Sequence, residues 1–215
     1  MNTINIYTDG SALKNPNGPG GWAAIICFTD GRQLRLSGAE PDTTNNRMEM
    51  TAALRGLEAV RPIANATSAK VVLHTDSQYV QLGMSQWVRG WLASGWVTST
   101  GKEVSNIDLW QRLVAAASGM KVEWKWVRGH VGHRENEVAD QMAGMAARSK
   151  QGQVISLSAE EVASGQFDAT TPTGRARATV IEVDTTSSDS EIAALIREHL
   201  GAAGGKSVRF RERMG

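Results

Sequence analysis

The chain has 215 residues, of which 41% are hydrophobic, and its formal net charge at pH 7 is +1. This small net charge does not identify a polyanion or a membrane surface as a partner, and the sequence has no run of about eighteen apolar residues that would span a bilayer. The N-terminus lacks the basic segment and apolar stretch of a secretory signal, so we expect a cytoplasmic protein with no membrane partner. Cys27 is the only cysteine, which excludes an internal disulfide and predicts a small buried residue in the apolar run "GWAAIICF".

Strand signals dominate the first part of the chain. "TINIYTD" alternates polar and apolar side chains and ends at "GSALKNPNGPGG", which is rich in Gly, Pro and Asn. Two further strand-like runs, "GWAAIICFTD" and "RQLRLSG", are separated by Asp30-Gly31, a strong hairpin signal. A helix containing Glu49 follows, and Arg61-Pro62 predicts its end.

Strands and helices alternate in the next part. The apolar run "AKVVLHTD" predicts a buried strand, and Asp76-Ser77 can cap the helix "SQYVQLGMSQWVRGWL". A polar loop leads to the helix "IDLWQRLVAAAS", then to the strand "KVEWKWVRG" and the helix "ENEVADQMAGMAARS". This order predicts one α/β domain over residues 1–150.

The composition changes beyond Lys150. Residues 151–177 are rich in Gly, Ser and Thr without a clean period, which predicts a linker-like segment. Residues 178–215 contain the signals of a strand, a capped helix and a strand, so we expect a small βαβ-like extension of unknown role. Arg209, Arg211 and Arg213 alternate in its last strand, which fits a solvated edge strand, a phosphate contact, or a contact with a partner or second copy.

Acidic residues stand at the ends of several predicted elements. Asp9 and Asp76 each follow an apolar run and a threonine, and either one alone is typical of a simple turn. Two of them at the carboxyl ends of strands in one α/β sheet would face the crevice where such folds bind ligands. Glu49 near a helix start is also explained by helix propensity and the helix dipole, while Asp140 interrupts an apolar neighbourhood.

Four converging carboxylates would need cations, because like charges in close proximity repel one another. Mg²⁺ suits an all-oxygen site and keeps water positions for phosphate oxygens. Two such ions about 4 Å apart could activate a water and stabilise the leaving oxygen of a phosphodiester. Zinc is disfavoured, because His130 and His133 in the loop "RGHVGHREN" have no second His or Cys pair beside them. His130 instead fits proton transfer to a leaving group or help with product release.

The motifs that carry these residues resemble one family. "YTDGS…NP…GPGGW", "TTNNRMEM", "TDSQYV", "DLWQRL" and "WVRGHVGHRENEVADQMA" occur in this order across residues 3–148. They closely resemble bacterial type 1 ribonuclease H, and "TTNNRME" together with the histidine loop is far more specific than four acidic residues alone. The resemblance implies a ribonuclease H-like α/β fold with a five-stranded mixed sheet flanked by helices.

The resemblance also implies an activity and a cofactor. The family cuts the RNA strand of RNA–DNA hybrid duplexes as an endonuclease by two-metal-ion catalysis, leaving 5′-phosphate and 3′-hydroxyl ends. Mg²⁺ would be the cofactor, with Mn²⁺ able to replace it, and we expect a monomer. At the matching positions, the catalytic residues that also bind metal would be Asp9, Glu49, Asp76 and Asp140, and the assisting catalytic histidine would be His130.

Recognition of a hybrid requires contacts to the minor groove, where amides can pair with 2′-hydroxyls and base edges. By resemblance, amide side chains line this groove, one threonine touches a DNA phosphate, and one tryptophan helps to form a channel for the DNA backbone. The predicted substrate-binding residues are Asn15, Thr44, Asn45, Asn46, Gln78 and Trp87. Each also has a structural explanation as a turn, cap or core residue.

The protrusion, which we define as residues 89–106, departs from the family pattern. In the family this segment commonly carries a run of basic residues, whereas here Arg89 and Lys102 are opposed by Glu103. Because phosphate contacts drive hybrid affinity and its salt dependence, we expect weaker hybrid binding than a fully basic protrusion would give.

Two alternatives remain beside the nuclease. One is a catalytically silent hybrid-binding module on the same fold, which the loss of a metal carboxylate would favour. The other is a transposase or junction resolvase of the wider superfamily, which would not be expected to combine "TTNNRME" with the histidine loop.

Overall fold

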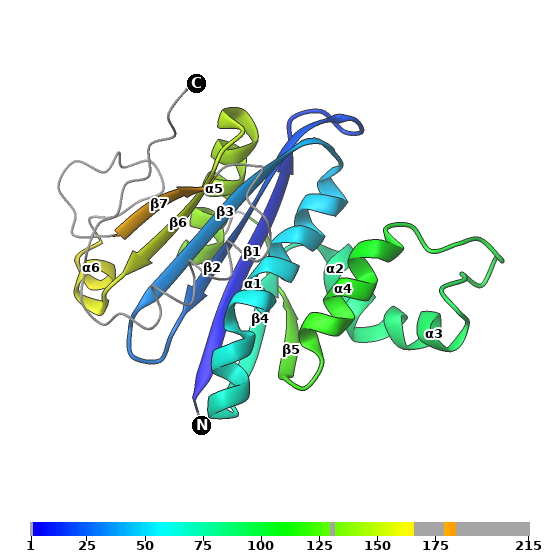
Figure 1. The fold of residues 1–215 in the computed structure, drawn as a ribbon, viewed down its shortest axis with the longest axis horizontal. Coiled ribbons are helices and arrows are strands. Elements are labelled where there is room, and N and C mark those ends of the chain that lie inside the picture. The colour runs from blue at the N-terminus through cyan, green and yellow to red at the C-terminus, as the bar shows by residue number, and fades with distance from the viewer. Residues whose placement is uncertain (1, 130–131, 166–178, 184–215) are drawn as a thin grey trace, which may run out of the picture.

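A mixed seven-stranded sheet forms the centre of the computed structural model, which describes residues 2–129, 132–165 and 179–183 (Figure 1). The strand order is β5-β4-β1-β2-β3-β6-β7. β4 and β5 run parallel to β1, and the other neighbouring strands pair antiparallel. The strands are β1 (Thr3–Ala12), β2 (Gly18–Cys27), β3 (Gln33–Thr43), β4 (Lys70–Thr75), β5 (Lys121–Trp126), β6 (Gly152–Leu157) and β7 (Thr179–Val183).

Helices cover both faces of this sheet, with α1 and α5 on opposite sides (Figure 1). α4 packs beside α1, and a π-helical turn, η1, joins α2 to α3. The helical segments are α1 (Asn45–Thr67), α2 (Gln78–Leu82), η1 (Gly83–Trp87), α3 (Val88–Ala93), α4 (Ile107–Ala117), α5 (Arg134–Ser149) and α6 (Ala159–Ser164). No helix in the described ranges has the length and apolar character needed to cross a bilayer.

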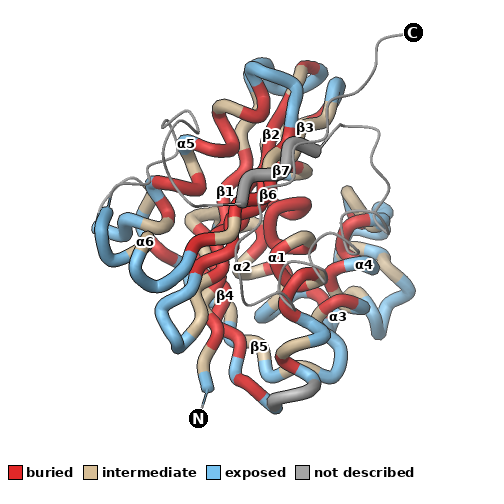
Figure 2. The backbone as a smooth tube through the Cα atoms, turned by 60° about the vertical axis from the view of Figure 1, so that its left-hand side comes forward, coloured by how far each residue is buried: buried red, intermediate tan, exposed pale blue. Residues whose placement is uncertain are grey.

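The core has two parts, one on each face of the sheet (Figure 2). The larger part lies against α1 and α4 and includes Ile6, Leu36 and the fully buried Trp110. The smaller part lies against α5 and includes Ile25 from β2 and Met142 from α5. Alternate residues of the central strands enter opposite parts, as the two-residue period of a strand requires.

The predicted α/β fold with a mixed sheet is confirmed, but the expected number of strands is wrong. The sheet has seven strands rather than five, because β6 pairs with the free edge of β3 and β7 pairs with β6. The linker-like prediction for residues 151–177 therefore fails for its first half, which forms β6 and α6. Val154, Ile155 and Leu157 are buried there, so tertiary pairing and burial override a Gly- and Ser-rich local composition.

The predicted hairpin and the predicted end of the first helix have different outcomes. The hairpin at Asp30-Gly31 is confirmed, since β2 and β3 pair antiparallel around that turn and Gly31 has a φ of +86°. The end of α1 at Arg61-Pro62 is wrong, because the helix continues to Thr67. Ile63 and Ala64 pack on the larger core beyond the proline, and this packing outweighs the loss of one backbone hydrogen bond.

The C-terminal extension is described only in part. Its first predicted strand coincides with β7, whereas its predicted helix and last strand, including Arg209, Arg211 and Arg213, lie outside the described residues. The predicted division of the chain at residue 150 stays a prediction.

Substituting Gly21 tests the close contact between β2 and α5. A Cβ at Gly21 would collide with the backbone of Ala143 and Ala147, so we expect Gly21→Ala to lower the free energy of unfolding by about 3 kcal/mol. Gly90→Ala is the matched control, because nothing lies within 4 Å of a Cβ there, and it should raise stability by about 0.5–1 kcal/mol. Urea unfolding of both variants measures the change in the free energy of unfolding. Equal changes in the two variants would contradict the close contact between β2 and α5.

Candidate active site

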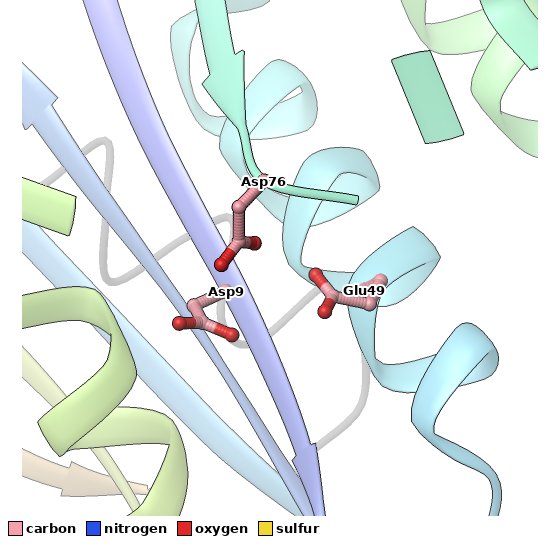
Figure 3. Close-up of side chains that lie close together, drawn as sticks. All are labelled: Asp9, Glu49 and Asp76. Atoms are coloured by element: carbon pink, nitrogen blue, oxygen red, sulfur yellow. The ribbon is translucent and has the colours of Figure 1, made fainter. Parts of the chain in front are cut away.

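Three carboxylates from distant parts of the chain meet where the parallel pairing of β1 with β4 ends (Figure 3). Asp9 lies on β1, Asp76 directly follows β4, and Glu49 lies in α1. One potential ligand atom from each lies within 4.8 Å of those of the other two, which is close enough for a shared cation. The parallel pairing of Thr8 with Thr75 places Asp9 and Asp76 at the same level of the sheet.

Burial and mutual repulsion disfavour the charged forms of these carboxylates. Burial, followed by the charges of Asp76 and Asp140, raises the pKa of Asp9 to about 8. Burial, followed by the charges of Asp9 and Asp76, holds the pKa of Glu49 well above its usual value. A hydrogen bond from the Gly10 amide acts against both shifts but does not cancel them.

Two glycines allow the backbone to approach the carboxylates closely. A Cβ at Gly10 would overlap the backbone of Met48 and Glu49, so this glycine lets α1 pack directly on β1. A Cβ at Gly129 would lie 2.6 Å from Oδ2 of Asp76, so the chain after β5 passes directly beside that carboxylate. The signal for Gly10 was present in the sequence as "TDG", whereas nothing local marked Gly129 as an active-site neighbour.

Neighbouring side chains hold the carboxylate-bearing elements in place. Asn45 accepts a hydrogen bond from the Ala12 amide at 3.3 Å, and its own amide nitrogen lies 3.5 Å from Oε1 of Glu49. Trp126 donates from Nε1 to the backbone carbonyl of Asp76 at 3.0 Å. The sequence predicted Asn45 as a substrate residue, and the structure adds a contact to Glu49. The role of Trp126 was missed, because an alternating Trp on a strand predicts only core packing.

Asp140 lies farther out than the other three carboxylates. It extends from α5 and is half-buried, and its charge raises the pKa of both Asp9 and Glu49. The set of atoms within 4.8 Å nevertheless excludes it. The structure thus brings three of the predicted metal residues together and places the fourth beside them.

The donor set fits a hard divalent cation. Within the part of the chain that the structure describes, the one group of three potential metal ligands consists entirely of carboxylates, which favours Mg²⁺ or Mn²⁺ over zinc. Oδ2 of Asp9 and Oε2 of Glu49 are buried without a hydrogen-bond partner. A cation would compensate both the missing partners and the repulsion.

The predicted substrate residues differ in their exposure. Thr44 caps α1 by accepting a hydrogen bond from the Arg47 amide, so part of its role is structural. Asn15, Asn46 and Gln78 are exposed, as a contact to substrate requires. Gln78 begins α2, next to the Ser77 cap.

Trp87 belongs to an aromatic group that supports the protrusion. Its ring lies 6.2 Å from that of Tyr79 and 5.7 Å from that of Trp91, centroid to centroid, and 36% of the residue is exposed. Trp91 in turn packs on Trp96 and on the buried Trp110. Trp87 is therefore partly exposed on one side and supported by aromatic rings on the other, while Trp91 and Trp110 serve packing.

His130, the predicted assisting histidine, lies outside the described residues. His133 directly precedes α5, is exposed, and its ring lies 6.4 Å from that of Tyr7. The structure therefore places the carboxyl-terminal end of the histidine loop at the start of the helix that carries Asp140.

An acidic centre at the edge of this mixed sheet defines a nuclease of the ribonuclease H type. Residues 1–148 match the family model described as RNase H, and the chain belongs to the ribonuclease H family. The resemblance to bacterial type 1 ribonuclease H seen in the sequence is thereby confirmed, and the protein is a nuclease.

Curated relatives and solved structures agree with this assignment. The chain is 51% identical over 140 residues to Ribonuclease H of Bradyrhizobium sp. (strain ORS 278), covering 65% of this chain and 86% of the relative. It is 48% identical over 153 residues to Ribonuclease HI of Caulobacter vibrioides, covering 71% of this chain and 97% of the relative. Among solved structures, LC9-RNase H1, a type 1 RNase H with the type 2 active-site motif, matches with a TM-score of 0.62 and 35% identity, over 70% of this chain and 74% of that one.

The raised pKa of Asp9 predicts how stability depends on pH when no divalent cation is bound. Folded Asp9 keeps its proton up to about pH 8, whereas in the unfolded chain it would lose it near its ordinary value of 3.8. The folded state therefore binds more protons between these values, and the free energy of unfolding should fall as pH rises from 5 to 8.

Chemical denaturation in the presence of a chelator, repeated across this pH range, measures the slope. Asp9→Asn removes the titrating group, so this variant should have a shallower slope and exceed the wild type in stability at pH 8. Asp30→Asn, in an exposed turn, is the control and should keep the wild-type slope. Equal slopes for all three proteins would show that Asp9 titrates normally.

Proposed function

We propose that the protein is an endoribonuclease that hydrolyses the RNA strand of RNA–DNA hybrids by two-metal-ion catalysis, leaving 5′-phosphate and 3′-hydroxyl ends, and that it acts as a monomer. The convergence of Asp9, Glu49 and Asp76 within 4.8 Å carries this proposal. Asp9 and Glu49 are buried, and repulsion among the three carboxylates disfavours their charged forms unless a cation joins them. A phosphodiester nuclease makes use of such cations.

Asp9, Glu49, Asp76 and Asp140 would hold the cations in this proposal. When bound, Mg²⁺ or Mn²⁺ would supply charge neutralisation, orientation of the scissile phosphate and a lower pKa for the attacking water. The chain's own residues prepare the site. Gly10 and Gly129 let the backbone approach closely, and Asn45 orients Glu49. His130, which precedes α5 in the sequence, would transfer a proton to the leaving 3′ oxygen.

The exposed amides beside this centre suit the hybrid minor groove. Asn15, Asn46 and Gln78 can pair with 2′-hydroxyls on one strand and with base edges. Thr44 would contact a phosphate of the DNA strand, and Trp87 would line the path of the DNA backbone. The combination would distinguish a hybrid from either uniform duplex, because it requires RNA on one side of the groove and DNA on the other.

Cleavage of a labelled RNA–DNA hybrid in Mg²⁺ tests the activity, with RNA–RNA and DNA–DNA duplexes alongside. Asp9→Asn should lower the rate by about 10³-fold, because a loss of about 4 kcal/mol of charge stabilisation slows a step by that factor. Asp30→Asn, an exposed aspartate paired with Arg32, is the matched control and should cleave normally. Tight hybrid binding without cleavage in both Mg²⁺ and Mn²⁺ would instead support the silent hybrid-binding module.

Hybrid affinity as a function of salt tests the weakly basic protrusion. Each phosphate contact contributes about 0.9 to the slope of log affinity against log salt. The double variant Arg89→Ala/Lys102→Ala should therefore reduce the slope by no more than about 2, in keeping with at most two contacts. Lys121→Ala, at the opposite end of β5 from the carboxylates, should leave the slope unchanged. A larger loss in the double variant would show that the protrusion dominates binding.

A further inference from the structure

β6 and α6 lie beyond residues 1–148, the part of the chain that the family model matches. They nevertheless belong to the same sheet and the same hydrophobic core as the matched residues. β6 pairs antiparallel with β3 from Gln33 to Ser37, and a Cβ at Gly152 would collide with the backbone of Ser37. A residue larger than glycine would therefore not fit between β6 and β3 at this point.

The two faces of β6 enter different parts of the core. Val154 belongs to the larger part, on the α1 side of the sheet. Ile155 and Leu157 belong to the smaller part, where they form one cluster with Val138, Ala139 and other residues of α5. Val162 of α6 packs against the same cluster. Neighbouring residues of one strand therefore support different helices.

α5 is supported in two ways along its length. Its C-terminal half sits directly on β2, where a Cβ at Gly21 would overlap the backbone of Ala143 and Ala147. Its N-terminal half packs against the side chains from β6 and α6, and Gly165, at the end of α6, lies beside Arg134, the first residue of α5. α5 as a whole packs on β1, β2 and β3, and the side chains of β6 and α6 add support to its N-terminal half from residues that follow the helix in the chain.

Asp140 directly follows Val138 and Ala139 in this N-terminal half. Asp140 lies outside the group of ligand atoms within 4.8 Å of one another, but close enough to raise the pKa of Asp9 and Glu49. A small displacement of α5 therefore changes its distance from a shared cation, whereas Asp9 and Asp76 are fixed by paired strands.

We propose that Ile155 and Leu157 are positioning residues for Asp140: by packing against the N-terminal half of α5, they set the affinity of the acidic centre for divalent cations. The inference rests on the proposed function, in which Asp140 is a cation ligand. It assigns a role in the active site to a segment that lies outside the matched family region.

Calorimetric titration of the full-length chain with Mn²⁺, without nucleic acid, tests this proposal. Ile155→Ala should weaken Mn²⁺ binding by about tenfold, the effect typical of removing support for a ligand. Ile155→Val, which keeps most of the packing, should bind like the wild type. Val154→Ala is the matched control on the other face of the same strand, where it also creates a buried cavity. It should lower the melting temperature but keep wild-type Mn²⁺ affinity.

A double-mutant cycle separates the possible failures. In the Asp140→Asn background, Ile155→Ala should have no further effect on Mn²⁺ affinity, because the ligand that it positions is gone. If Asp140→Asn weakens Mn²⁺ binding while Ile155→Ala does not, or if Val154→Ala weakens it equally, the positioning role is wrong and the proposed function stands. If Asp140→Asn leaves Mn²⁺ affinity unchanged, the ligand role of Asp140 in the proposed function is wrong, and the positioning role with it.

Discussion

Repulsion among buried carboxylates is the constraint on which the rest of this structure depends. Asp9, Glu49 and Asp76 lie together in a place that disfavours their charged forms, as the raised pKa values of Asp9 and Glu49 show. Flexible segments would relieve such repulsion by moving apart, so each residue must be held by a rigid element. Parallel strand pairing holds the two aspartates, and the direct packing of α1 on β1 at Gly10 holds the glutamate. Protonation of Asp9 and Glu49 lowers the electrostatic energy of this arrangement, and a bound cation would lower it without neutralising the carboxylates.

Much of the fold and the centre of the site could be predicted from the sequence, because both follow from local signals. Asp30-Gly31 marks a hairpin, and the shared pattern of apolar run, threonine and aspartate predicts Asp9 and Asp76 at strand ends. This prediction is right for Asp76, whereas β1 continues past Asp9 to Ala12 in its pairing with β2. Once two parallel strands are inferred, the convergence of these residues follows from sheet geometry. Asn46 and Gln78 are exposed, and their contact with substrate stays a prediction.

The features that escaped prediction depend on contacts between distant residues. Nothing near Gly129 shows that its backbone passes beside Asp76, and Pro62 ends a helix by local rules although packing of Ile63 and Ala64 carries α1 past it. The Gly- and Ser-rich composition after Lys150 conceals a buried strand, because the partner that stabilises it is the edge of β3, more than a hundred residues earlier. Such contacts are a property of the folded chain rather than of any segment.

The pairing of β3 with β6 also has a consequence for how the protein is made. The hydrogen bond from the Gln153 amide to Oγ of Ser37 joins residues 116 positions apart. During synthesis from the N-terminus, β3 is therefore complete long before its second neighbour has left the ribosome. Throughout that interval the nascent sheet exposes an unpaired edge, which is a template for association with other chains. The addition of β6 then covers this edge of β3.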